Sequence, residues 1–157
     1  MLSPGRLVVQ MEHTSSVGWS LALNMLLQQK TLNEEITYQG VGLHSGLPVT
    51  MTFKPTAADT GIVFVRTDLP DCPSVKAEPA NVTNTMRATT LEAGAAKVFT
   101  VEHVLAAFYG LGIDNCYVEL DSPEPPVGDG SAAVFVDLIE KAGIVTLDAV
   151  RNVHKVK

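Results

Sequence analysis

The chain has 157 residues, of which 46% are hydrophobic and 18% are charged. This is the composition of a globular domain with a sizeable core, and it excludes disorder over most of the length. The net charge is -6 and the 11 lysines and arginines are scattered, so the sequence indicates no nucleic-acid-binding surface and no nucleic-acid partner.

The cysteines and the N-terminal residues bear on the cellular compartment. Cys72 and Cys116 are far apart and form no CxxC pair, so we expect reduced thiols rather than a disulfide framework or a cysteine zinc site, with Cys116 in a buried strand. No apolar run approaches the roughly 18 residues of a transmembrane segment. Residues 1–30 lack the charged start, long apolar block and cleavage site of a signal peptide, and they are treated as a leader without an assigned role. The expected location is the cytoplasm.

Alternation of apolar and polar residues predicts strands from Thr31 onwards. A β-hairpin is expected, in which Leu32–Tyr38 and Leu47–Phe53 are joined by the loop GVGLHSG. The proline-rich stretch Leu69–Pro79 is expected to be loop. Further strands are predicted for Gly61–Arg66, Val82–Leu91 and Ala96–Phe99.

A short helix is expected from Val101 to Leu111. Thr100 is a good N-cap residue, and Val101, Leu105 and Phe108 recur at helical spacing, so they predict one apolar stripe that faces the core. Glycines close to the C-terminal end of this segment are typical of a helix terminus.

Glu102 and His103 are adjacent at the start of this helix. At roughly 100° per residue, His103 is expected opposite the apolar stripe, flanked by Ala106 and Ala107. Glu102 lies where the partial positive charge of a helix N-terminus holds a carboxylate ionised. An ionised carboxylate beside an imidazole suits metal chemistry, but it is also the ordinary electrostatics of a helix start, and catalytic zinc usually takes three protein ligands plus water. Spacing alone leaves both interpretations open.

The rest of the chain predicts one more strand and one more helix. Cys116–Leu120 alternates as a half-buried strand. After a Pro/Gly-rich loop, Ser131 is expected to cap a helix that ends at Gly143 and buries Ala132, Phe135, Ile139 and Ala142. The GDGS turn at its start is either an ordinary cap or an anion site. Strands followed by two helices with a strand between them indicate an α+β fold: a mainly antiparallel sheet with both helices packed on one face.

Four motifs follow one another in this chain: GVGLHSG at Gly40–Gly46, ATTL at Ala88–Leu91, TVEHVLAAFYGLGIDN at Thr100–Asn115, and PEPPVGDGSA. Together they resemble the UDP-3-O-acyl-N-acetylglucosamine deacetylase family, the zinc amidohydrolases of lipid A biosynthesis. The resemblance covers about Thr31 to Ile144. It implies the first of two related domains of the ribosomal protein S5 domain 2-like type, with the active site between them.

The resemblance also implies roles for particular residues. The cofactor is Zn²⁺, His103 is one metal ligand, and Glu102 is the general base that takes a proton as water attacks the acetamide of a UDP-sugar lipid substrate. A His and an Asp of the second domain complete the metal site, and another His there is the general acid. Met86 and Arg87 are candidates for substrate contact, and His44 lies near the site.

This sequence departs from the family pattern at several points. Gly128 stands where a bulky apolar residue is usual, Arg87 replaces a residue that is often apolar, and no second-domain ligand set follows His103. We therefore expect a leader over residues 1–30, the first deacetylase domain over residues 31–145, and a linker with the start of a missing second domain over residues 146–157. Such a chain is expected to bind zinc weakly and to be nearly inactive alone. The alternative is a non-catalytic α+β domain used for binding or assembly.

Overall fold

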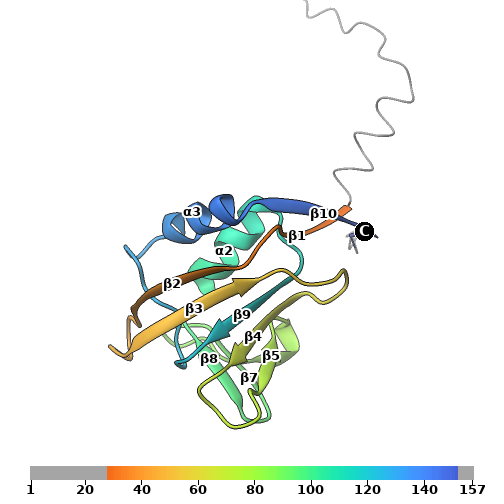
Figure 1. Cartoon of the computed structure of the whole chain (residues 1–157). Helices are drawn as coiled ribbons and strands as arrows, with labels where there is room; N and C mark the ends of the chain where they lie inside the picture. Colours follow the sequence, from red (N-terminus) through yellow and green to blue (C-terminus); the bar gives the residue numbers. More distant parts are fainter. Residues whose placement is uncertain (1–27, 152–157) are drawn as a thin grey trace, which may run out of the picture.

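The computed structural model describes residues 28–151 (Figure 1). The leader expected over residues 1–30 therefore lies almost wholly outside the described residues, as does the end of the expected linker, residues 152–157. Neither described α-helix is long and apolar enough to cross a membrane.

A five-stranded sheet forms the centre of the fold. Its strands lie in the order β2-β3-β9-β4-β5. All neighbours are antiparallel except β4 and β9, which are parallel. The strands are β2 (Ile36–Val41), β3 (Pro48–Lys54), β4 (Ile62–Arg66), β5 (Ser74–Lys76) and β9 (Cys116–Leu120). The hairpin and the strands at residues 61–66 and 116–120 are confirmed, whereas the predicted loop 69–79 is wrong where it contains β5.

The register of this sheet explains why one face is buried. Phe53 of β3 pairs with Val118 of β9, which pairs in turn with Phe64 of β4, and all three are fully buried on the same face. The alternate residues carry polar groups, as in the pair of Lys54 and Glu119, whose Nζ and Oε2 atoms lie 2.8 Å apart. Period-two alternation thus separates an apolar face from a polar one.

Both described α-helices cover the apolar face. They are α2 (Glu102–Leu111) and α3 (Ala133–Ala142), and they lie side by side on one side of the sheet (Figure 1). The ring of Phe53 lies 4.9 Å from that of Phe108 on α2 and 6.5 Å from that of Phe135 on α3, measured between centroids. The expected α+β fold with two helices on one face is therefore confirmed.

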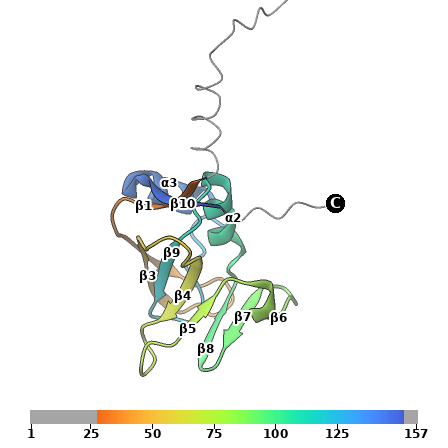
Figure 2. The same ribbon diagram turned by 90° about the vertical axis from the view of Figure 1, so that its right-hand side faces the viewer.

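Two smaller sheets complete the described fold. Strand β1 (Gln28–Leu32) pairs with β10 (Ile144–Val150), so residues 146–150, expected to begin a linker, pair with the start of the described chain. The second small sheet has the order β6-β7-β8 and follows the 3-10 turn η1 (Pro79–Asn81). Figure 2 shows it beyond β4 and β5, at the end of the molecule away from α3. Its strands are β6 (Val82–Asn84), β7 (Thr90–Ala93) and β8 (Ala96–Phe99).

Two strands that were predicted as continuous are interrupted. The strand expected over residues 32–38 breaks at residues 33–35, because β1 joins β10 while β2 joins β3. The strand expected over residues 82–91 breaks at residues 85–89, where Arg87 has a φ of +65°. A left-handed residue cannot continue a strand, so the chain leaves the sheet there.

Candidate active site at the start of helix α2

Glu102 is the first residue of α2, and it is exposed. One of its carboxylate oxygens, Oε1, accepts a hydrogen bond from the backbone N–H of Thr89, in the segment between β6 and β7. Among residues 28–151 the second oxygen, Oε2, has no hydrogen-bond partner. The carboxylate is thus held by one oxygen at the positive end of the helix.

Thr100 does not cap α2, which corrects the sequence-based expectation. Val101 is the N-cap residue and α2 has no side-chain cap bond. The Thr100 hydroxyl instead donates to Oε1 of Glu124 at 2.7 Å, and Thr100 has a φ of +58°. A side-chain hydroxyl caps a helix when its oxygen accepts a hydrogen bond from a backbone N–H of the first turn. The Thr100 hydroxyl instead bonds to Glu124, in another segment.

His103 is half-buried rather than opposite the core. The buried residues of α2 are Val104, Ala107 and Phe108, and the N-cap residue Val101 is buried as well. The expectation that Ala107 lies on the face opposite the stripe is therefore wrong, and Leu105, expected in the stripe, is only partly buried. Because the stripe is centred near Val104, His103 lies about 100° to its side. No hydrogen bond within residues 28–151 involves its imidazole.

An acidic side chain from the loop before α3 lies near His103. Hydrogen bonds from the side chain and the backbone N–H of Ser131 lower the pKa of Asp129, and the nearby charge of His103 adds to this effect. Ser131 Oγ donates to Asp129 and accepts from Ala133 N at 3.1 Å, so the side chains of the GDGS turn bond to one another and to the first amide of α3. The N-cap residue of α3 is Ala132 and the helix has no side-chain cap bond, so the expectation that Ser131 caps it is wrong. Gly128 of this loop has a φ of +59°, a conformation that favours glycine.

A pocket of about 200 Å³ brings together three residues that the sequence placed near a site. It is lined by His44 from the β2–β3 loop, by Met86 and Arg87, and by Ala88, Thr90 and Phe99. Met86 is 81% exposed, and Arg87 is exposed as well. Thr89, the residue between two lining residues, is the one that bonds Glu102. The structure therefore connects the Met86–Arg87 segment to the start of α2.

Glu124 is a residue of this region that the sequence-based reasoning missed. It is 0% exposed and accepts hydrogen bonds from the backbone of His44 and Ser45 and from the side chain of Thr100. Burial acts to raise the pKa of Glu124, but these bonds outweigh it and lower the pKa. The only local signal is a charged residue that lies between two prolines, four residues after the end of β9.

The described residues supply at most part of a metal site. Within residues 28–151 no group of three or more His, Cys, Asp or Glu side chains is placed to hold a metal ion. His103 has an uncommitted imidazole, which is what a ligand requires, but a zinc site usually takes three protein ligands. Within residues 28–151, His103 alone therefore does not make a zinc site.

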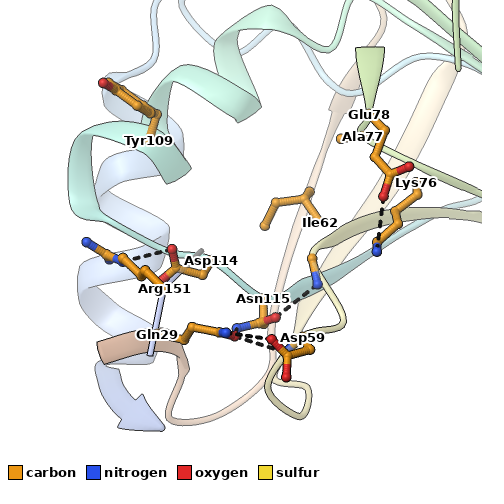
Figure 3. Close-up of a pocket in the computed structure, with 11 residues that line it drawn as sticks. Gln29, Asp59, Ile62, Lys76, Ala77, Glu78, Tyr109, Asp114, Asn115 and Arg151 are labelled. Atoms are coloured by element: carbon orange, nitrogen blue, oxygen red, sulfur yellow. Dashed lines mark hydrogen bonds and ion pairs between the residues drawn. The ribbon is translucent and has the colours of Figure 1, made fainter. Parts of the chain in front are cut away.

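A larger pocket, of about 930 Å³, lies at the other end of α2, beside Tyr109 (Figure 3). Its polar side chains bond mainly to one another. Gln29 donates to Asp59 at 2.7 Å, Asn115 donates to Gln29 at 2.9 Å, and Arg151 pairs with Asp114 at 2.9 Å. Because these groups fasten β1 to neighbouring segments, the pocket is lined by a structural network rather than by uncommitted reactive groups.

The comparisons with known proteins agree with this geometry. Residues 29–157 match the family described as UDP-3-O-acyl N-acetylglycosamine deacetylase, LpxC. The chain is 51% identical over 128 residues to the bifunctional enzyme LpxC/FabZ of Chlorobaculum tepidum, across 82% of this chain and 27% of that protein. It is 47% identical to the UDP-3-O-acyl-N-acetylglucosamine deacetylase of Citrifermentans bemidjiense and 49% identical to that of Hahella chejuensis, each over 132 residues.

The two deacetylase alignments cover 84% of this chain but 43% and 44% of the relatives, so the chain spans less than half their length. The match nevertheless extends across all the described elements from β1 to β10. The chain belongs to the UDP-3-O-acyl N-acetylglycosamine deacetylase family.

Proposed function

We propose that this chain is the N-terminal part of a zinc-dependent deacetylase that hydrolyses the N-acetyl group of UDP-3-O-acyl-N-acetylglucosamine in lipid A biosynthesis. The reaction is placed in the cytoplasm. Residues 31–145 form the first domain, and the remaining metal ligands come from a second domain of the same enzyme. The observation that carries the proposal is the pairing of Glu102 and His103 at the start of α2, in a chain of this family.

Glu102 is the general base. Its position at a helix N-terminus favours the ionised form, and the N–H of Thr89 holds Oε1 in place. The uncommitted Oε2 is the atom that takes a proton from the attacking water. General-base catalysis of this kind is worth about 10²–10⁴-fold in rate.

His103 is the metal ligand from this domain. Its half-buried imidazole has no hydrogen-bond partner within residues 28–151, so a nitrogen is available for coordination. The chemistry that zinc supplies when bound is polarisation of an amide carbonyl and a lowered pKa for water. Adjacent residues on a helix point about 100° apart, so Glu102 and His103 address one reacting centre from neighbouring directions.

Met86 and Arg87 contact the substrate. They line the pocket that also includes His44, and the segment that carries them is bonded to Glu102 through Thr89. The exposed thioether of Met86 suits an apolar part of the substrate, and the guanidinium of Arg87 suits a phosphate oxygen.

The proposal is tested by deacetylation assays on this chain expressed together with the sequence that its gene encodes after Lys157. The wild-type protein should release acetate from UDP-3-O-acyl-N-acetylglucosamine. Glu102→Gln should lower kcat by about 10²–10⁴-fold while the bound zinc is retained. Asp137→Asn, on the exposed side of α3, serves as the matched control and should leave kcat unchanged. Near-normal turnover of Glu102→Gln would refute the base assignment, and an inactive wild-type protein would refute the function.

A further inference from the structure

Among residues 28–151, Glu124 is the one carboxylate that is buried. It lies in the loop after β9, and its two oxygens accept four hydrogen bonds. Three come from the β2–β3 loop: Ser45 N donates at 2.8 Å to Oε2, and His44 N lies 3.1 Å from each oxygen. The fourth comes from the Thr100 hydroxyl at 2.7 Å. One side chain therefore joins segments that are 79, 80 and 24 residues away in the sequence.

The β2–β3 loop is built closely around this carboxylate. A Cβ atom added to Gly42 would lie 2.4 Å from Oε2 of Glu124 and 2.2 Å from the Ser45 hydroxyl, so the loop has no room for a side chain there. The backbone of Gly42 also forms a bridge with Pro126. The loop that carries His44 is thus held against the Glu124 segment by its backbone as well as by the carboxylate.

Thr100 transmits the position of Glu124 to the helix start. A left-handed φ of +58° is costly for a β-branched residue, and such a conformation persists only where surrounding contacts hold it. The two contacts are the Thr100–Glu124 hydrogen bond and the bond from Phe99 N to Pro123 O at 3.1 Å. The turn at Thr100 redirects the chain from β8 into α2, so it sets the direction in which Glu102 and His103 leave the sheet.

We propose that Glu124 is a positioning residue of the deacetylase: through Thr100 it orients Glu102 and His103, and through Ser45 it fixes the His44 loop against them. The inference rests on the proposed function for its catalytic consequence. It differs from a purely structural role in one respect. If Glu124 positions the catalytic residues, loss of the Thr100 hydroxyl or of the Glu124 charge must lower kcat, and the two losses must not multiply in the double variant. A purely structural role would lower the stability of the fold without this shared effect on kcat.

Two substitutions at Thr100 separate the hydroxyl from the side-chain shape. Thr100→Val keeps the β-branched shape and removes the donor, whereas Thr100→Ser keeps the donor. Glu124→Gln removes the charge with little change in volume. Asp121→Asn is the matched control, since Asp121 also accepts a backbone N–H, from Thr50 at 2.6 Å, in the same connection after β9 but bonds neither Thr100 nor the His44 loop.

The first measurement uses the enzyme with its second part and zinc bound. Glu124→Gln and Thr100→Val should each lower kcat at least tenfold, with KM and zinc content within twofold of wild type, and Thr100→Ser should stay within threefold. The double variant should be no slower than the slower single variant, because both changes break the same link. Wild-type kcat in Thr100→Val, or single effects that multiply in the double variant, would overturn the proposal.

The second measurement needs no activity. In ¹H–¹⁵N spectra of the 157-residue chain, Thr100→Val should shift the amide signals of Glu102, His103 and Ser45, whereas Thr100→Ser and Asp121→Asn should leave them near their wild-type positions. Unshifted signals in Thr100→Val would contradict the link itself. If the wild-type enzyme lacks deacetylase activity, the proposed function fails, and these spectra still decide whether Glu124 positions the helix start. If Glu124→Gln does not fold, the Thr100 pair provides the same comparison.

Discussion

The two cysteines lie in opposite environments, which gives a direct test at the residue scale. Cys72 is exposed, whereas Cys116 is buried in β9, where burial raises the pKa of its thiol to about 12. A thiol must ionise to react, so we expect one thiol per chain to react with Ellman's reagent at pH 8 and two in guanidinium chloride. Two fast-reacting thiols in the folded chain would place Cys116 outside the core.

Glu124 predicts a pH dependence of stability. Its carboxyl has a lowered pKa in the folded chain, so ionisation stabilises the fold above the unfolded pKa of about 4.3, and this stability is lost as the pH falls through the folded pKa. In urea unfolding at pH 7, Glu124→Gln should be less stable than wild type by about 1.5–3 kcal/mol, the usual worth of hydrogen bonds to a charged group. The difference should shrink below about pH 4. An equal difference at pH 3.5 and pH 7 would contradict the assignment.

Some residues of the candidate site could be predicted from the sequence, and others could not. Glu102 and His103 were found because a helix start is a local pattern, and the structure puts them there. Glu124 was missed because its partners His44 and Ser45 are about 80 residues away, and a Glu between prolines reads as an exposed loop. Thr100 was assigned as a cap because its residue type fits, but its φ of +58° depends on that same distant carboxylate.

At the scale of elements, the end of α2 gives a prediction with an internal control. Gly112 is the C-cap residue with a left-handed φ of +70°, whereas Gly110 lies inside the helix with no atom within 4 Å of an added Cβ. Gly112→Ala should therefore destabilise the chain by about 1–2 kcal/mol. Gly110→Ala should stabilise it by about 0.5–1 kcal/mol. Urea unfolding of both variants checks this, and shifts in the same direction would show that the cap conformation is unimportant.

Elements with a clear period were predictable, and those set by distant pairing were not. Strands β3, β4 and β9 alternate and bury one face, and α2 and α3 have apolar stripes, so their existence follows from local pattern. Strand β5 has three residues in a proline-rich stretch and exists because it pairs with β4. Strand β10 alternates only between half-buried and exposed positions, and it forms because β1 lies beside it.

At the scale of the whole molecule, the proposed function gives the described fold one side of an active site. Within residues 28–151 the face with Glu102, His103 and the small pocket supplies a carboxylate proposed as the base, one imidazole and substrate-contact candidates, but no metal-binding group of three. The 157-residue chain alone should therefore bind zinc weakly and turn over little or no substrate. Equilibrium dialysis and acetate release check this, and robust turnover by the chain alone would contradict the account.

The most direct test of the central claim is the zinc content of the enzyme that contains this chain and its continuation. His103→Ala should reduce bound zinc from about one per chain to a small fraction, because one of three protein ligands is removed. His44→Ala, which changes an exposed histidine of the neighbouring pocket, should keep the wild-type zinc content. Both are read by metal analysis after dialysis. Full zinc occupancy in His103→Ala would contradict the claim that the start of α2 provides a metal ligand.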